Sequence, residues 1–129
     1  MTESQNLLEN QKNGKIIVLF EVEIKDGKKE DYLNRATTLK EYLKNMKGFI
    51  SAERFQSLAN EKKLLSMTIW ESEESIKIWR NMQEHRDSQM AGRMEDFEDY
   101  KITVVTPIRE YGMNDRKNAP TDSNDYFKV

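Results

Sequence analysis

The spacing of hydrophobic positions changes several times along the chain, and each change marks an expected element. Residues 15–24 are β-branched and aromatic and alternate strictly at their end, which predicts a β-strand. An Asp26-Gly27 pair interrupts it. Beyond Lys28, apolar side chains recur three or four positions apart, at Tyr32, Ala36, Leu39, Leu43 and Met46. This spacing predicts an amphipathic helix, closed by Gly48 because glycine accepts the left-handed conformation without a Cβ penalty.

The next pattern is that of a β-hairpin. Two strand-like runs, residues 49–58 and 63–71, are joined by the short polar segment 59–62. Ser72 then precedes two glutamates, and a hydroxyl N-cap with acids in the first turn is typical of a helix start. Apolar positions at a spacing of three, Ile76, Trp79 and Met82, predict that this second helix follows the hairpin directly.

The end of the folded region combines a helical piece and a strand. Met90, Met94 and Phe97 continue the helical spacing, but Gly92 interrupts it. A glycine inside a helix costs about 1 kcal/mol relative to alanine, so we expect a break or bend there. Residues 100–111 predict the last strand, with Pro107 at a bulge or an edge.

The resulting order is β-α-β-β-α-β, which predicts an α+β protein of the ferredoxin-like type. Its expected sheet is four-stranded and antiparallel, with both helices on one face. A chain of 129 residues suits one domain. We expect this domain over residues 15–112, with polar, flexible tails at residues 1–14 and 113–129.

Several expected strands are apolar at both parities, as in Ile16-Ile17, Leu64-Leu65 and Val104-Val105. Alternate residues of a strand point to opposite faces of the sheet, so helices on one side can cover only half of these side chains. A second copy of the chain, packed sheet against sheet, would cover the rest, because an isologous dimer needs only one patch. The alternative is a monomer that exposes the patch or folds a tail over it.

The composition of the chain indicates which partners and which cellular compartment to expect. Charged residues make up 34% of the chain, hydrophobic residues 36%, and the formal net charge is -2. The two signs are interleaved, without the concentrated basic surface on which nucleic-acid binding depends, so we expect no nucleic-acid or membrane partner. No apolar run reaches the ~18 residues of a membrane span, and the first residues do not resemble a signal peptide. We therefore expect a cytoplasmic protein.

The residue types present argue against a metal site and against cysteine-based chemistry. The chain has no cysteine and one histidine, which excludes disulfides, thiolate nucleophiles and cysteine zinc sites. The acidic run from Glu95 to Asp99 is more typical of a solvated face than of a metal cage. No metal site is expected.

A few side chains are candidates for a site. His85, the single histidine, has the pKa range of a general acid or base, although a solvated or capping histidine would read the same way. Trp79 and Met82 lie on an apolar helical stripe, and Trp70 ends a strand. These residues could wall a pocket for a flat ligand or simply form core.

The second half of the chain resembles the antibiotic biosynthesis monooxygenase (ABM) family. The resemblance rests on the run from Trp70 to Arg80, on Glu84-His85-Arg86, and on Arg109-Glu110-Tyr111-Gly112. It covers about residues 15–112. It implies a homodimer in which two ferredoxin-like units form an α/β barrel, each with a pocket between sheet and helices.

The resemblance implies a function as well as a fold. Some members of the family oxidise aromatic substrates with dioxygen and without a cofactor, and others bind and degrade haem. We expect the first activity, on a small aromatic or quinone-type molecule. The site residues would be His85 as the catalytic residue and Trp79, Trp70, Phe20 and Met82 around the substrate. The alternative is a non-catalytic protein that binds a hydrophobic ligand, haem included.

Two departures count against haem degradation. The resemblance places the axial histidine of the haem-degrading members where this chain has Gln89, and an asparagine of theirs where it has Phe20. Cofactor-free oxidation instead needs a dry cavity and a group that takes a proton from the substrate. Besides His85, the candidates for this proton transfer are Tyr32, Tyr42, Glu21 and Glu23.

Overall fold

Four antiparallel strands form the centre of the molecule. The computed structural model describes residues 14–129, except for the side chain of Gln83. The sheet has the order β2-β3-β1-β4, and every neighbouring pair is antiparallel. The strands are β1 (Ile16–Ile24), β2 (Phe49–Gln56), β3 (Lys63–Trp70) and β4 (Phe97–Val105). This is the α+β, ferredoxin-like topology that the hydrophobic pattern predicts, including the β2-β3 hairpin.

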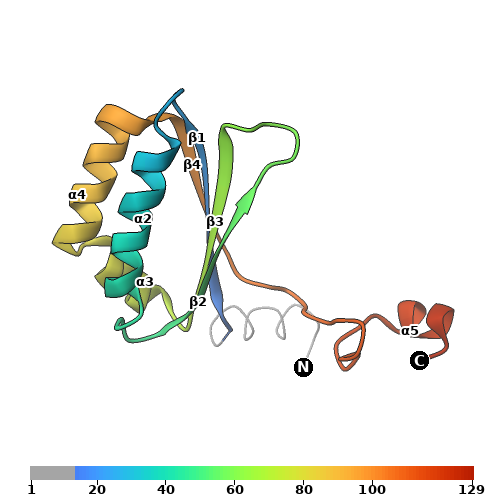
Figure 1. The fold of residues 1–129 in the computed structure, drawn as a ribbon. Helices are drawn as coiled ribbons and strands as arrows, with labels where there is room; N and C mark the ends of the chain where they lie inside the picture. Colours follow the sequence, from blue (N-terminus) through green and yellow to red (C-terminus); the bar gives the residue numbers. More distant parts are fainter. Residues whose placement is uncertain (1–13) are drawn as a thin grey trace.

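Three helices lie together on one side of this sheet (Figure 1). Helix α2 connects β1 to β2, and α3 and α4 connect β3 to β4. Their bounds are α2 (Lys29–Leu43), α3 (Glu73–Arg80) and α4 (Gln83–Ala91). Ser72 caps α3 as expected, since its Oγ accepts a hydrogen bond from the backbone N–H of Ser75 at 3.2 Å.

The second crossover is more broken than the apolar spacing predicts. Helix α3 ends at Arg80, and Met82 lies between α3 and α4 instead of on a continuous helix. The expected irregularity at Gly92 is confirmed, because there the α-helix gives way to a π-helical turn, Gly92–Asp96. A Cβ at Gly92 would collide with the ring of Phe97, which explains the glycine. Phe97 itself belongs to β4, which starts earlier than predicted and ends before Pro107.

Gly48 has a different role from the one expected. Helix α2 ends at Leu43, and Gly48 lies farther on, in the turn that leads into β2. Its φ of +84° is in the left-handed region, and a Cβ there would collide with Oγ of Ser75. The glycine is therefore required by the turn and by the close approach of α3.

The core between helices and sheet consists of two apolar clusters. The first surrounds Trp70 and Trp79 and includes Leu43, with Leu39 and Met46 packed against it. The second lies around Val22, Ile24, Tyr32 and Leu64. The expected stripe of α2 thus contributes to both clusters, with Tyr32 at one end of the helix and Leu43 at the other.

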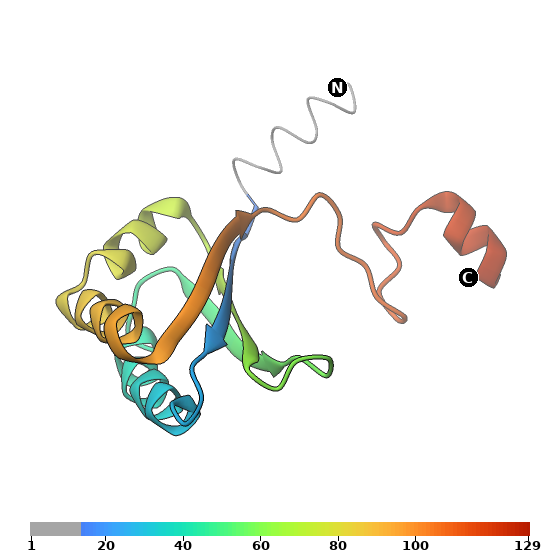
Figure 2. The ribbon, with the colours of Figure 1, turned by 90° about the horizontal axis from the view of Figure 1, so that it is seen from above.

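The opposite face of the sheet is also apolar. In β1, Val18 faces the helices and its neighbour Leu19 faces away, as the strand alternation requires. We call the face away from the helices the outer face. Its apolar members are Ile17, Leu19, Phe55, Leu65, Met67, Ile69 and Val105. Helices α2, α3 and α4 leave it uncovered, and Figure 2 shows the last helix, α5 (Thr121–Phe127), lying apart from the sheet.

The structure describes one of the two expected tails and not the other. Residues 1–13 lie outside the described part of the chain. Residues 113–129 contain α5, and Arg116 ties it to the preceding segment: its Nε donates to Asn124 Oδ1 at 3.1 Å and its Nη2 to Ser123 Oγ at 2.9 Å. The flexibility of both tails stays a prediction. Over residues 14–129, no helix is long and apolar enough to cross a membrane.

Candidate functional site

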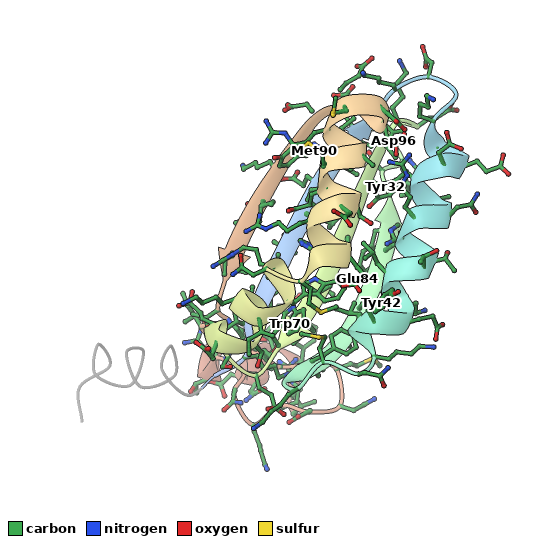
Figure 3. The ribbon with its side chains drawn as sticks, turned by 90° about the vertical axis from the view of Figure 1, so that its left-hand side faces the viewer. Tyr32, Tyr42, Trp70, Glu84, Met90 and Asp96 are labelled. Atoms are coloured by element: carbon green, nitrogen blue, oxygen red, sulfur yellow. The ribbon has the colours of Figure 1, made fainter. Side chains whose placement is uncertain are left out.

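A cavity of about 600 Å³ lies between the sheet and the helices. This is within the range of pockets that hold small organic ligands, about 300–1,000 Å³. All four strands contribute to its walls, together with α2, α3, α4 and the π-helical turn. The two ends of the cavity differ in chemistry. Figure 3 shows Trp70 near one end of the helical layer and Tyr32 with Asp96 near the other.

One end of the cavity is aromatic. Trp70 is fully buried and Trp79 nearly so, with ring centroids 6.3 Å apart. The imidazole of His85 packs on Trp79 with a centroid distance of 5.0 Å. Flat ring systems stack favourably on such surfaces. Trp70 and Trp79 also belong to the first core cluster, so they are core residues and cavity walls at once.

His85 is partly buried in this wall, which corrects the view of it as a solvated residue. Its Nδ1 is buried and has no hydrogen-bond partner in the described part of the chain. Burial lowers the pKa of His85 below its ordinary value of 6.5, and a backbone interaction with Arg80 opposes this only in part. The imidazole is therefore neutral at pH 7 and able to accept a proton.

The lowered pKa of His85 predicts a loss of stability in mild acid. The unfolded chain binds a proton on this residue more readily than the folded chain does. Its contribution to stability is therefore complete above about pH 6.5 and is lost as the pH falls through the folded-state pKa. Urea unfolding between pH 7.5 and 5 should show the wild-type free energy of unfolding falling more steeply than that of His85→Asn. Parallel curves for the two proteins would contradict the burial of His85.

The other end of the cavity combines charged side chains with the rings of Tyr32 and Phe97, whose centroids are 5.7 Å apart. Asp96, in the π-helical turn, is completely buried, and its Oδ2 lies 3.2 Å from Nη1 of Arg35 on α2. Nη2 of Arg35 donates a 2.8 Å hydrogen bond to Oε2 of the exposed Glu95. One guanidinium thus faces two carboxylates.

Tyr32 lies beside this cluster. The guanidinium carbon of Arg54, on β2, is 5.6 Å from the centre of the Tyr32 ring. Burial raises the pKa of Tyr32, and Arg54 offsets this only partly. The phenol therefore keeps its proton near neutral pH and serves as a hydrogen-bond donor, which argues against Tyr32 as the group that takes a proton.

Four of the five expected site residues border the cavity: His85, Trp79, Trp70 and Phe20. Met82 does not line it and packs against the first core cluster instead. Three further methionines do not line the cavity either. Met67 lies on the outer face, and Met90 and Met94 are exposed.

The expected proton carriers are scattered. Tyr32 lines the cavity, but Tyr42 is 41% exposed and does not. Glu21 and Glu23 share one face as expected, but it is the outer face, where Glu21 lies 3.4 Å from the Lys63 ammonium. Neither glutamate can reach a molecule on the helix side of the sheet.

Asp96 is the site residue that the sequence pattern misses. The run from Glu95 to Asp99 looks like a solvated face, and Asp96 contradicts this because it is fully buried. The spacing from Gly92 is the signal that could have predicted the burial of Asp96. Residues four positions apart lie on the same side of a helix, and Gly92 packs against Phe97. Within residues 14–129, no group of three or more histidine, aspartate or glutamate side chains could hold a metal ion.

Comparison with known proteins identifies the family and agrees with the fold. The model of the family "Antibiotic biosynthesis monooxygenase" matches residues 15–91. The chain belongs to this ABM family. A relative from Pyricularia oryzae, named "Jasmonate monooxygenase ABM", is 32% identical over 104 residues, which are 81% of this chain and 48% of the relative. The chain therefore spans about half the length of that protein.

Solved structures confirm the ABM fold. A conserved protein from Methanosarcina mazei has a TM-score of 0.68 at 18% identity, covering 77% of this chain and 97% of that one. A variant of SnoaB, a cofactor-independent oxygenase from Streptomyces nogalater, has a TM-score of 0.66 at 6% identity, covering 78% and 97%. At such identities the likeness establishes the fold alone. The resemblance seen in the residues after Trp70 is confirmed at the level of family and fold.

Proposed function

We propose that this ABM protein is a monooxygenase that oxidises a small, ring-containing molecule in the cavity with dioxygen and without a bound metal or cofactor. The observation that carries the proposal is the cavity itself, in a chain of this family. It has the volume of a small ligand, tryptophan rings at one end and a neutral, partly buried histidine against them. The names of the relatives support a monooxygenase, and one of them is described as cofactor-independent.

The proposed chemistry needs only a proton acceptor and a dry cavity. A base takes a proton from a CH₂ group activated by a neighbouring carbonyl, and the ring system delocalises the resulting carbanion. The carbanion passes one electron to dioxygen, and the two radicals combine into a peroxide that takes up a proton. Loss of water then leaves a carbonyl. One oxygen atom ends in the product and one in water, so the sum is CH₂ + O₂ → C=O + H₂O.

Two residues have protonation states that suit these steps. Neutral His85 is the proposed proton acceptor, since burial keeps its proton site free at pH 7. Tyr32 retains its proton and would donate a hydrogen bond to the substrate oxygen on which negative charge develops. The aromatic wall of Trp70 and Trp79 would hold the ring system and exclude water.

The departures from the haem-degrading members lie in the cavity itself. Gln89 and Phe20 both border it, at the positions where the resemblance places a histidine and an asparagine in those members. An amide and a phenyl ring supply no axial imidazole. We therefore propose that haem degradation is not the activity of this chain.

Oxygen uptake with anthrone tests the proposed activity. In the presence of a chelator, the wild-type protein should consume one O₂ for each anthraquinone formed, above the rate of the uncatalysed oxidation. His85→Gln should lower kcat by about 10²–10⁴, the usual effect of removing a general base. Tyr42→Phe, a change at an exposed residue outside the cavity, is the matched control and should be unaffected. Jasmonate, named for the Pyricularia oryzae relative, is the second compound to assay. Uptake no faster than in buffer with both compounds would overturn the proposal and favour a binding protein.

We also propose that two copies of the chain pair through their outer faces. The support is the set of apolar side chains on that face, which α2, α3 and α4 leave uncovered. An isologous contact would bury the same residues of both copies. A cytoplasmic location and the absence of nucleic-acid partners also stay predictions.

A further inference from the structure

The charged end of the cavity contains an anion with unusually little compensation. The side chain of Asp96 is 1% exposed, and neither of its carboxylate oxygens has an aligned hydrogen bond within the described chain. Nη1 of Arg35 is near enough to Oδ2 for an ion pair at 3.2 Å but is itself without an aligned acceptor. The better hydrogen bond of Arg35 goes to Glu95, in solvent.

A buried carboxylate in this state is expensive. Buried polar atoms are almost always hydrogen-bonded, and leaving a charged acceptor unpaired costs more than leaving a neutral one. Asp96 borders the cavity, but neighbouring atoms cover both of its carboxylate oxygens, so a bound molecule supplies the missing donor only if the side chain turns toward it. π-helical turns such as Gly92–Asp96 also occur frequently at functional sites.

The charges around Asp96 indicate what kind of donor fits. Asp96 and Glu95 are two negative charges beside the positive charge of Arg35, and Arg54, next to the ring of Tyr32, is a second positive charge on the cavity wall. A ligand carboxylate would face the carboxylate of Asp96, and a ligand ammonium would face the guanidinium groups of Arg35 and Arg54. A neutral hydroxyl group avoids both repulsions and still donates to Asp96.

We propose that Asp96 accepts a hydrogen bond from a neutral hydroxyl group of the bound molecule, which makes it a specificity-determining residue for hydroxylated ring compounds. Nη1 of Arg35 lies 3.2 Å from the carboxylate, while the tryptophan end receives the apolar part of the ring system. The inference rests on the proposed function in one respect, since both assume that the substrate binds in the cavity. It concerns the binding step and not the oxidation.

Paired naphthalene probes test this proposal without any reaction. Binding of 2-naphthol and of 2-methoxynaphthalene, its methyl ether, is measured by ligand fluorescence under argon. The two probes share the ring and differ in the O–H donor. Wild-type protein should bind 2-naphthol at least about tenfold more tightly than 2-methoxynaphthalene, because only 2-naphthol can donate a hydrogen bond to the carboxylate.

The variants separate Asp96 from its surroundings. Asp96→Leu should reduce the preference for 2-naphthol to less than about twofold, and Asp96→Asn should give an intermediate value. Glu95→Gln removes an equal charge from the same Arg35 but at an exposed position, so it should keep the wild-type preference. Thermal unfolding of each variant confirms that it is folded. Asp96→Leu removes the carboxylate that lies 3.2 Å from Nη1 of Arg35, but Arg35 keeps its hydrogen bond to the exposed Glu95, so the variant should be folded when tested.

Three results would overturn the inference: equal binding of the two probes by wild-type protein, a preference that persists in Asp96→Leu, or no binding of either probe. Equal binding is also what ordered water on Asp96 would produce. The result is independent of the oxygenase assay. A preference for 2-naphthol without oxygen uptake would contradict only the proposed function. Oxygen uptake without this preference would contradict only the present inference.

Discussion

Replacing Trp70 with alanine is expected to lower the free energy of unfolding by about 3–5 kcal/mol, the range for truncating a large buried aromatic residue. Trp70 has no exposed surface. It packs against Phe49 and Trp79, with ring centroids at 5.5 and 6.3 Å, and its indole N–H donates to Thr68 Oγ1 at 2.8 Å. Alanine would leave a cavity and an unpaired hydroxyl in the first core cluster.

Urea unfolding followed by circular dichroism measures this loss. Trp70→Phe keeps a ring in the core but removes the donor to Thr68, so its loss should be smaller than that of the alanine variant. Tyr126→Ala, at an aromatic residue that is 80% exposed, should change the free energy by less than about 0.5 kcal/mol. A loss below about 1 kcal/mol for Trp70→Ala would contradict its place in the core.

Replacing Gly48 with alanine is expected to be the second most damaging change, at about 2–4 kcal/mol. Gly48 and Gly27 both have a positive φ, +84° and +77°. Alanine at either position takes on the left-handed strain of about 1–2 kcal/mol. A Cβ at Gly27 meets nothing within 4 Å, whereas at Gly48 it collides with Ser75, which is buried at the start of α3.

Gly27→Ala is therefore the matched control, and the difference between the two losses isolates the contact with Ser75. Removing the Ser75 side chain as well, in Gly48→Ala with Ser75→Gly, should recover part of the stability relative to Gly48→Ala with Ser75 intact. If the two alanine variants unfold at the same urea concentration, the close approach of Gly48 to α3 is wrong.

Local pattern was sufficient to predict the four strands, the helical crossovers between them and the two apolar faces of the sheet, but not helix α5. Strand alternation and helical spacing are properties of neighbouring residues, and β1 shows both faces within Val18 and Leu19. The breaks in the second crossover were harder to predict. Met82 fits the stripe of Ile76 and Trp79, but it lies beyond the end of α3, and only Gly92 signalled an irregularity.

The candidate site was predicted in part, because aromatic residues on an apolar stripe are either core or pocket wall and Trp79 is both. Asp96 was not predicted. Its burial depends on Arg35, which belongs to a distant part of the chain, and on a π-helical turn that brings it inward. Pairing of this kind leaves no periodic trace in a single sequence.

Strands β1 and β3 serve two surfaces at once. Phe20, Ser66 and Thr68 border the cavity, while their immediate neighbours Leu19 and Met67 point to the outer face. A ligand in the cavity that changes the twist of these strands would also change the affinity of the outer face for a second copy of the chain. Thermodynamic reciprocity then requires that occupancy of the outer face change the affinity for the ligand by the same factor. If a ligand does change the twist of these strands, ligand binding and the proposed pairing of two outer faces are thermodynamically coupled.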